Sequence, residues 1–268
     1  VPLQSVADYE RLRPWLYPRD VVDERELERW AREREQGAAV IWITLEGFFW
    51  FPRMLLGIEP HLFAFYDRPD LLRQINADLV EHNLRVWERV VAVCAPDFMT
   101  FAEDMSYNHG PMLSRALFDE FLLPCYRAVL PAVKRLGTLA LVDSDGDVTE
   151  LAGWLEAAGI EGLLPLERQA GVDIVRLRAE HPAMRFVGHY DKRVMHCGET
   201  AMRREFERLL PVAARGGFMV SCDHQTPPEV AYADYRLYLE LFWEYAIEAG
   251  RQSREPAGAV GGARRGTA

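Results

Sequence analysis

Four short apolar runs along this chain stop abruptly in acidic or imidazole side chains. Together with the polar residues that end them, these runs are residues 98–104, 139–146, 186–192 and 218–224. Each run has the length and composition of a buried parallel strand, and a helical pattern follows it. The polar groups therefore fall at the carboxyl ends of strands, where α/β folds keep their chemistry.

Strands and helices are predicted to alternate along most of the chain. Six strands are predicted, at residues 39–45, 98–102, 138–143, 162–166, 184–190 and 217–222. Helices are predicted near residues 53–57, 60–66, 69–94, 114–136, 148–158, 171–180, 198–213 and 228–249. Asp67 is the expected N-cap of the long helix that starts at Pro69. Such alternation predicts βαβ units and an α/β fold with a parallel sheet.

Length and composition predict one large domain with short additions at both ends. The 268 residues are 49% hydrophobic, which is enough to bury a sizeable core. Residues 1–37 are charged and form a helical lead-in, with helical stretches near 6–12 and 24–36. The α/β domain is expected over residues 38–250. Residues 251–268 are rich in Gly, Ala and Arg without periodicity, which predicts a disordered tail.

Charge and cysteine content narrow the class of protein. The formal net charge of -10 argues against nucleic-acid binding, which needs a basic stripe to neutralise phosphates. No apolar stretch approaches the roughly 20 residues that span a bilayer, and no signal pattern opens the chain. We therefore expect a soluble, cytoplasmic protein that binds neither nucleic acid nor membrane. The four cysteines lack metal-finger spacing, which predicts reduced, mostly buried thiols.

Several segments at predicted strand ends and in one helix resemble a known superfamily. The segments are residues 47–52, 110–124, 143–146, 158–165 and 227–230. They resemble the uroporphyrinogen decarboxylase superfamily, which includes corrinoid-linked methyltransferases, over about residues 38–247. The resemblance implies a (β/α)₈ TIM-type barrel with its site at the carboxyl-terminal mouth, and a homodimer. Because six strands are visible and the sequence begins at Val1, the barrel is expected to be incomplete at the amino terminus.

Two departures from this superfamily change the expected chemistry. The decarboxylases hold their substrate with an arginine-rich segment near the first strand, and this chain has none. The zinc methyltransferases carry His-x-Cys after one strand and a further Cys near the last, and by position these ligands fall on Asp143, Asp145 and Asp223. Three carboxylates favour Mg²⁺, Mn²⁺ or Ca²⁺ over thiolate-bound zinc, with His189 or His224 as a further nitrogen ligand.

The acids at the predicted strand ends would repel one another if they shared one cavity. Two like charges about 4 Å apart repel by roughly 4 kcal/mol at an effective dielectric constant near 20. Lys192 and Arg193 could not balance all the acids, so a bound cation, an amine or a neutral methylated substrate is favoured over a polyanionic porphyrinogen. The acids concerned are Glu103, Asp104, Asp143, Asp145, Glu167, Asp191 and Asp223.

Structural roles compete with these site roles. The segment after Asp143 could be a helix-capping turn, with Asp147 as N-cap and Gly146 in an unusual backbone conformation. One acid of the pair Glu103 and Asp104 could bond loop amides. The neighbours Asp191 and Lys192 could form a structural ion pair, and His196 with Cys197 is expected to be structural. Of the aromatic run 48–51, part should enter the core and part should line the mouth.

Three function classes stay open. The first is methyl transfer from a small methylated substrate, with a corrinoid on a partner protein as acceptor and a divalent metal ion in the site. Its catalytic residues would be Asp143, Asp145, Asp223 and, as proton shuttle, His224. Its substrate contacts would be Glu103, Asp104, Glu167, Asp191, Lys192, Phe49 and Trp50. The second class is uroporphyrinogen decarboxylation, which needs no cofactor, and the third is a non-catalytic barrel that binds a small molecule.

Overall fold

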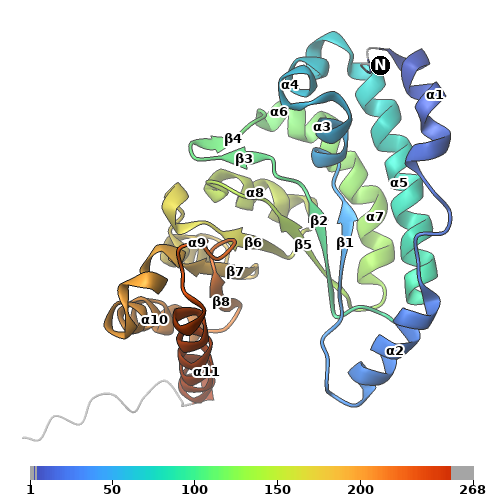
Figure 1. Ribbon diagram of the computed structural model, residues 1–268. Helices are drawn as coiled ribbons and strands as arrows, with labels where there is room; N and C mark the ends of the chain where they lie inside the picture. The colour runs from blue at the N-terminus through green and yellow to red at the C-terminus, as the bar shows by residue number, and fades with distance from the viewer. Residues whose placement is uncertain (1–2, 4, 255–268) are drawn as a thin grey trace, which may run out of the picture. The chain divides into compact units, whose positions relative to one another are not determined.

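The predicted alternation of strands and helices is present in the computed structural model, which describes residue 3 and residues 5–254 (Figure 1). The chain divides into two compact units, residues 1–164 and residues 165–268. In the described part of the chain, no helix is both long and apolar enough to cross a membrane.

The first unit holds four parallel strands and the helices that connect them. Its strands are β1 (Trp42–Glu46), β2 (Phe98–Ala102), β5 (Leu139–Asp143) and the first residues of β6 (Gly162–Leu166). They are paired in the order β1-β2-β5-β6. A small antiparallel hairpin is formed by β3 (Ser106–Tyr107) and β4 (Gly110–Pro111). Its helices are α1 (Val6–Leu16), α2 (Glu24–Glu35), α3 (Trp50–Leu56), α4 (Ile58–Asp67), α5 (Pro69–Val91), α6 (Arg115–Leu117), a π-helical turn (Phe118–Leu122), α7 (Leu123–Lys134) and α8 (Thr149–Ala158).

The register of this sheet brings three strand ends level with one another. Glu46 at the end of β1 is paired with Ala102 on β2, and Ala102 is paired with Asp143 on β5. The long helices α5 and α7 lie side by side along the sheet (Figure 1). Trp87 of α5 is fully buried there and donates its indole N–H to a carbonyl of α7. The carboxyl ends of these strands therefore carry the loops after β1, β2 and β5 side by side.

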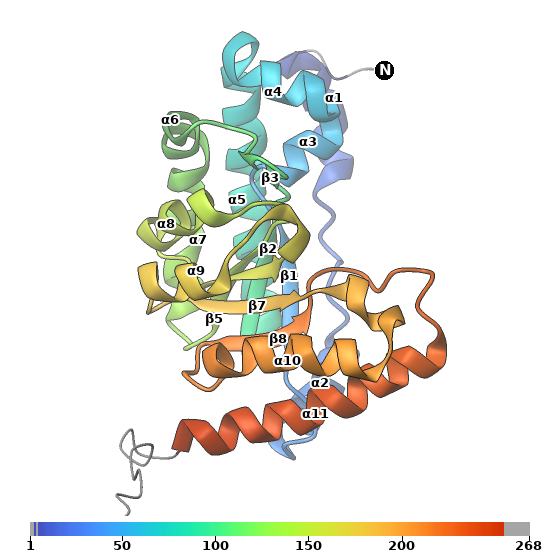
Figure 2. The ribbon, with the colours of Figure 1, turned by 90° about the vertical axis from the view of Figure 1, so that its left-hand side faces the viewer.

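The second unit is smaller and is built on two parallel strands. It contains a 3₁₀ turn (Arg168–Ala170), α9 (Ile174–Glu180), β7 (Arg185–Tyr190), a second 3₁₀ turn (Lys192–Cys197), α10 (Glu199–Ala213), β8 (Phe218–Cys222) and α11 (Tyr232–Arg254). Helices α10 and α11 pack against each other (Figure 2). The rings of Tyr190, Phe206 and Tyr238 meet between them, with ring centroids 4.5–5.7 Å apart.

Most predicted elements are confirmed, and the differences have local causes. All six predicted strands are present within three residues of the expected bounds. Asp67 is not an N-cap, because α4 runs on to include it and Arg68 occupies the cap of α5. The tail predicted from residue 251 starts too early, since α11 continues to Arg254; residues 255–268 lie outside the described part of the chain.

Candidate active site

Glu103, which directly follows β2, anchors the aromatic loop of the first unit. Its side chain is buried, and Oε1 accepts hydrogen bonds from the Phe48 amide (2.9 Å) and the Tyr126 hydroxyl (2.5 Å). Its Oε2 accepts from the amides of Phe49 (2.7 Å) and Trp50 (3.3 Å). The expectation that one acid of the pair bonds loop amides is therefore confirmed for Glu103.

The contact between Glu103 and this loop requires a glycine at position 47. A Cβ on Gly47 would lie 2.0 Å from the carbonyl oxygen of Ala102 and 2.4 Å from Oε2 of Glu103. Burial raises the pKa of Glu103 to about 7, while the Tyr126 hydroxyl and the loop amides oppose that shift. The Glu103 carboxyl group thus holds the loop in place, and its protonation state changes near neutral pH.

The loops after β2 and β5 are joined by hydrogen bonds. Asp104 has a left-handed backbone (φ 43°), its Oδ1 accepts from the Asp145 amide at 3.4 Å, and its carbonyl accepts from Arg53 at 2.8 Å. The buried Ser144 hydroxyl accepts from the Met105 amide at 3.1 Å. Asp104 and Asp145, predicted as site residues from separate segments, are therefore brought together.

The segment after β5 also forms the helix-capping turn considered above. A side-chain oxygen of Asp147 accepts a hydrogen bond from the first backbone amide of α8 at 3.0 Å. Asp147 lies one position before the N-cap residue of this helix. Gly146 has φ 83°, and a Cβ there would lie 2.7 Å from the backbone of Tyr107. The side chains of Asp143 and Asp145 are half-buried on the same turn. One short segment therefore combines a structural turn with two candidate ligands.

In the second unit, three strand ends meet at a lysine. The Nζ atom of Lys192, after β7, lies 3.6 Å from Oε1 of Glu167, after β6, and 3.6 Å from Oδ1 of Asp223, after β8. The side chain of Lys192 is 13% exposed and that of Asp223 is fully buried. Burial raises the pKa of Asp223, and the Lys192 ammonium opposes this shift. Glu167, Lys192 and Asp223 are all predicted site residues, and the structure brings them together.

Lysine is rare in this chain, so its use at this position is informative. Lys134 and Lys192 are the two lysines in the sequence, against 29 arginines among the 31 basic residues. Arginine is always charged and forms a rigid fork, whereas the lysine ammonium is compact and can release its proton. Lys192 therefore places a compact point charge, and not an arginine fork, between two carboxylates.

The remaining acids of this region are balanced by arginines. Asp191 forms a two-pronged ion pair with Arg193 (2.8 and 2.7 Å), which lowers the pKa of Asp191. Glu205 of α10 accepts from Arg208 at 2.8 Å and lies 3.7 Å from Nε of Arg168. The predicted ion pair of Asp191 with Lys192 is replaced by the pair with Arg193.

The predicted excess of negative charge is therefore wrong for the second unit. Its strand-end acids alternate with cations. Within either unit, the described residues bring no three His, Cys, Asp or Glu side chains into an arrangement that could hold a metal ion. That Asp143 and Asp145 share a site with Asp223 stays a prediction.

The histidines of the second unit occupy different environments. His189 is buried on β7 with a left-handed backbone (φ 65°), and its Nδ1 has no hydrogen-bond partner among the described residues. Burial, together with Arg208 and Arg168, lowers the pKa of His189 to about 3, so the ring is neutral at pH 7. His224, the predicted proton shuttle, is exposed. His196 is exposed on the 3₁₀ turn after β7.

The aromatic loop divides between core and surface, and whether its surface part lines the mouth of the site stays a prediction. Phe48 packs on Phe101 and Tyr126, and Phe49 packs edge-on against His61 with ring centroids 4.6 Å apart. Phe48 and Phe49 are almost completely buried. Trp50 is half-buried and carries the Arg53 guanidinium 5.1 Å above its ring. Of the two predicted aromatic contacts, Phe49 thus belongs to the core and Trp50 reaches the surface.

Sequence reasoning missed Glu205 and the arginines that accompany it. Glu205 is 8% exposed on α10, and its Oε1 accepts from the Asp191 amide at 3.1 Å. The sequence pattern could have identified Glu205, because this residue lies on the inward face of an amphipathic helix beside Met202 and Leu209. A carboxylate at such a position needs a buried partner.

Comparisons with known proteins identify a shared fold. No protein-family model matches the chain, and no curated protein matches its sequence. The chain is similar to the solved structure of a methyltransferase from Methanosarcina mazei, with a TM-score of 0.60 and 16% identity. The match covers 83% of this chain and 63% of that one, so the chain spans less than two thirds of the neighbour's length. This likeness shows an α/β fold of the same kind.

Proposed function

We propose that this chain is a methyl-transferring enzyme of the uroporphyrinogen decarboxylase superfamily, built on a (β/α)₈ TIM-type barrel. The fold likeness to a methyltransferase supports the proposal. The observation that carries it is the Lys192 ammonium, held 3.6 Å from a carboxylate oxygen on either side at the ends of three strands. Strand ends of this kind are where barrel enzymes place catalytic groups.

Lys192 would act as the general acid for the leaving group. When a methyl group leaves oxygen or nitrogen, the electron pair of the broken bond stays on that atom. A proton from Lys192 Nζ neutralises the leaving atom, while the acceptor supplies the electron pair of the new bond to carbon. Glu167 and Asp223 hold the ammonium in place, each with a carboxylate oxygen 3.6 Å from Nζ.

The methyl acceptor in this proposal is a corrinoid on a partner protein, which supplies a strongly nucleophilic metal centre. The residues of this chain bind the methylated substrate and exclude water. Asp191 is the proposed substrate contact of the second unit, and His224 is its proposed proton shuttle. Asp104, Asp145 and Trp50 stay predicted contacts on the first unit, and no step of the reaction depends on them.

A divalent metal ion fits this site less well than an ammonium. Asp223 already accepts from the Arg168 amide at 3.1 Å and lies beside the Lys192 ammonium, so a divalent cation there would meet like charge. Asp143 and Asp145 offer oxygen ligands that suit Mg²⁺ or Mn²⁺. Binding of such an ion at that pair is a separate prediction, and no step of the reaction depends on it.

The proposal is tested with the full chain, a panel of O- and N-methylated small molecules and reduced free cobalamin as acceptor. Formation of methylcobalamin is followed by absorbance and mass spectrometry. Lys192→Met should lower the rate at least ~100-fold, the usual effect of losing a general acid. Lys134→Met, which removes an exposed lysine on α7, should leave it unchanged. An unchanged rate in Lys192→Met contradicts the assigned role, and a panel without any transfer contradicts the proposed function.

Uroporphyrinogen decarboxylation is retained as a second candidate because of one observation. The cations Arg168, Lys192 and Arg193 balance the acids of the second unit, so the expected repulsion of an anionic substrate is weaker than the sequence implied. Incubation with uroporphyrinogen, followed by mass spectrometry for successive losses of carbon dioxide, tests this candidate. Decarboxylation in the absence of methyl transfer would replace the first proposal by the second.

A further inference from the structure

A cleft between two helices of the first unit gathers basic side chains that lie outside the candidate active site. It lies between α5 and the last turn of α1 with the residues that follow, and its volume is about 520 Å³. The two helices pack side by side (Figure 1). We call it the arginine cleft, because its charged lining residues are Arg13, Arg19 and Arg85, together with Asp78 and Glu81.

Two of these charged residues neutralise each other. Asp78 is 6% exposed, and its Oδ1 forms an ion pair with Arg13 at 2.5 Å. Its Oδ2 accepts hydrogen bonds from the Tyr9 hydroxyl at 2.7 Å and from Gln74 at 3.2 Å. Both oxygens of Asp78 are therefore satisfied within the chain, and the pair with Arg13 leaves little net charge in the cleft.

Arg85 carries a buried donor that has no acceptor in the described part of the chain. Its Nε atom is buried and makes no hydrogen bond there. A terminal nitrogen of its guanidinium donates to Nδ1 of His82 at 3.0 Å. Burial, together with the Arg85 charge, lowers the pKa of His82, so this ring is neutral at pH 7 and does not balance the guanidinium. An unsatisfied buried donor is costly, and an acceptor on a ligand would remove that cost.

Arg19 adds a second cation that pairs with no carboxylate of the described residues. Its side chain is exposed, and its backbone carbonyl accepts from Arg89 at 2.6 Å, which fixes this segment against α5. The charges that stay unpaired among the described residues of the cleft are thus Arg19 and Arg85 against Glu81. Two cations and one acid leave an excess of positive charge, although the chain as a whole has a formal net charge of -10. Such a local excess attracts anions.

The walls of the arginine cleft suit an anion that carries an apolar body. Guanidinium groups bind phosphate and carboxylate groups through paired N–H donors. The ring of Tyr17 and the prolines Pro14 and Pro18 line the same cleft and provide apolar surface beside the arginines. The volume of the cleft is in the range that small-molecule ligands occupy.

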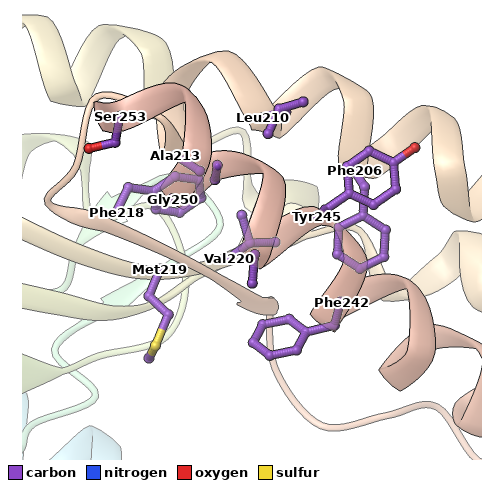
Figure 3. A pocket seen from close by; sticks show the side chains of 12 residues that line it. Phe206, Leu210, Ala213, Phe218, Met219, Val220, Phe242, Tyr245, Gly250 and Ser253 are labelled. Atoms are coloured by element: carbon purple, nitrogen blue, oxygen red, sulfur yellow. The ribbon is translucent and has the colours of Figure 1, made fainter. Parts of the chain in front are cut away.

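A cavity of the second unit shows the contrast. It measures about 260 Å³ and lies between β8, α10 and α11 (Figure 3). None of its 12 lining residues is charged, and most of them are phenylalanine, leucine, alanine, valine or methionine. Of these two cavities, the arginine cleft is therefore the one that can recognise an anion.

We propose that the arginine cleft binds a small organic anion, whose phosphate or carboxylate group lies between Arg19 and Arg85 and whose apolar body packs on Tyr17. An oxygen of the anion accepts from the free Nε of Arg85. This site is independent of the proposed reaction, since its residues lie on α1, on α5 and in the segment after α1. Raising salt from ~0.05 to ~0.5 M should weaken binding at least ~3-fold, because the Debye length shortens from over 10 Å to below 5 Å.

Calorimetric titration of the full chain near neutral pH tests the class of ligand. The probes are phenyl phosphate, benzoate, inorganic phosphate and, as the neutral control, phenol. At least one of the two organic anions should bind with a dissociation constant of ~1 mM or below, and the tighter of the two identifies the anionic group as phosphate or carboxylate. It should bind at least ~3-fold more tightly than inorganic phosphate, because its ring is buried. Absence of binding by both organic anions, equal binding of inorganic phosphate, or equal binding of phenol overturns the proposal.

Variants of the full chain test where the anion binds. Arg85→Met and Arg19→Met should each weaken binding at least ~10-fold, the usual effect of losing a hydrogen bond to a charged group. Glu81→Gln should tighten binding at least ~2-fold, because it removes the unpaired acid of the cleft. Arg73→Met is the matched control and should bind like the parent, since Arg73 is exposed on the same helix outside the cleft.

Arg19 and Glu81 are exposed, so their variants should keep the parent's far-ultraviolet circular dichroism and give a result even if Arg85→Met does not fold. An unchanged affinity in Arg19→Met or in Glu81→Gln overturns the proposed site. An equal loss of affinity in Arg73→Met would also overturn it, because the anion would then respond to charge anywhere on the helix.

Discussion

Replacement of Glu103 by glutamine tests how a fully buried carboxyl group is balanced against the donors that surround it. Burial raises the pKa of Glu103 from 4.5 to about 7 in the folded chain. A carboxyl group with a raised pKa binds more protons when folded than when unfolded between these pH values. Stability therefore falls as pH rises from 4.5 to 7, and the fall is worth ~3 kcal/mol at about 1.4 kcal/mol per pH unit.

Glu103→Gln removes this titration but also turns one acceptor into a donor. The Phe48 and Phe49 amides face different carboxylate oxygens, so one of them loses its acceptor and the variant is destabilised by ~1–3 kcal/mol at pH 5. The stability of the parent minus that of the variant should then fall by ~3 kcal/mol between pH 4.5 and pH 8, so that at pH 8 the variant is as stable as the parent or more stable. Free energies of unfolding from urea titrations at several pH values measure this difference.

The matched control is Glu88→Gln, because Glu88 is exposed on α5 of the same unit. Its effect should stay within ~0.5 kcal/mol at every pH. A difference between parent and Glu103→Gln that stays constant or grows with pH would refute the reasoning. It would show that the hydrogen-bond donors hold the carboxylate more strongly than burial disfavours it.

Two further predictions concern other points of the site. Gly47→Ala should destabilise the chain by more than ~3 kcal/mol in urea unfolding, because its Cβ would overlap the Ala102 carbonyl. Gly250→Ala, where nothing lies within 4 Å of the new Cβ, should be neutral or stabilising. An unchanged stability of Gly47→Ala would contradict the close approach. Asp191→Asn should lower the free energy of unfolding at pH 7, because it removes the ion pair with Arg193. The difference from the parent should largely disappear as the pH falls below the lowered pKa of Asp191, since the parent then loses the same charge. A difference that persists at pH 2 would contradict the ion pair.

The strands were predictable because each is a short, almost wholly apolar segment between polar residues. Residues such as Leu139–Asp143 have no helical periodicity and end at an acid, which identifies both the strand and its carboxyl end. The boundary at Asp67 was not predictable in this way. Local propensity favours a cap there, but packing of the buried Ala64 and Phe65 extends α4 through it.

The pairing of charges was less predictable than their positions. Asp191 and Lys192 are neighbours in sequence, yet Lys192 pairs with Glu167 and Asp223 from other strand ends. Such partners are chosen by the register of the strands and by the length of each side chain, and neither is encoded in local spacing. The same reasoning explains why Glu205 was overlooked, since its partners come from the turns after β6 and β7.

The central claim is that Lys192 and Asp223 form one buried charged unit at the strand ends, and a double-mutant cycle tests it most directly. Urea unfolding of Lys192→Met, Asp223→Asn and the double variant gives the coupling energy. Removing one member of a buried pair leaves the other uncompensated, so each single change should cost ~3 kcal/mol or more. The account predicts a coupling of ~2 kcal/mol or more; single effects that simply add, within ~0.5 kcal/mol, would contradict it.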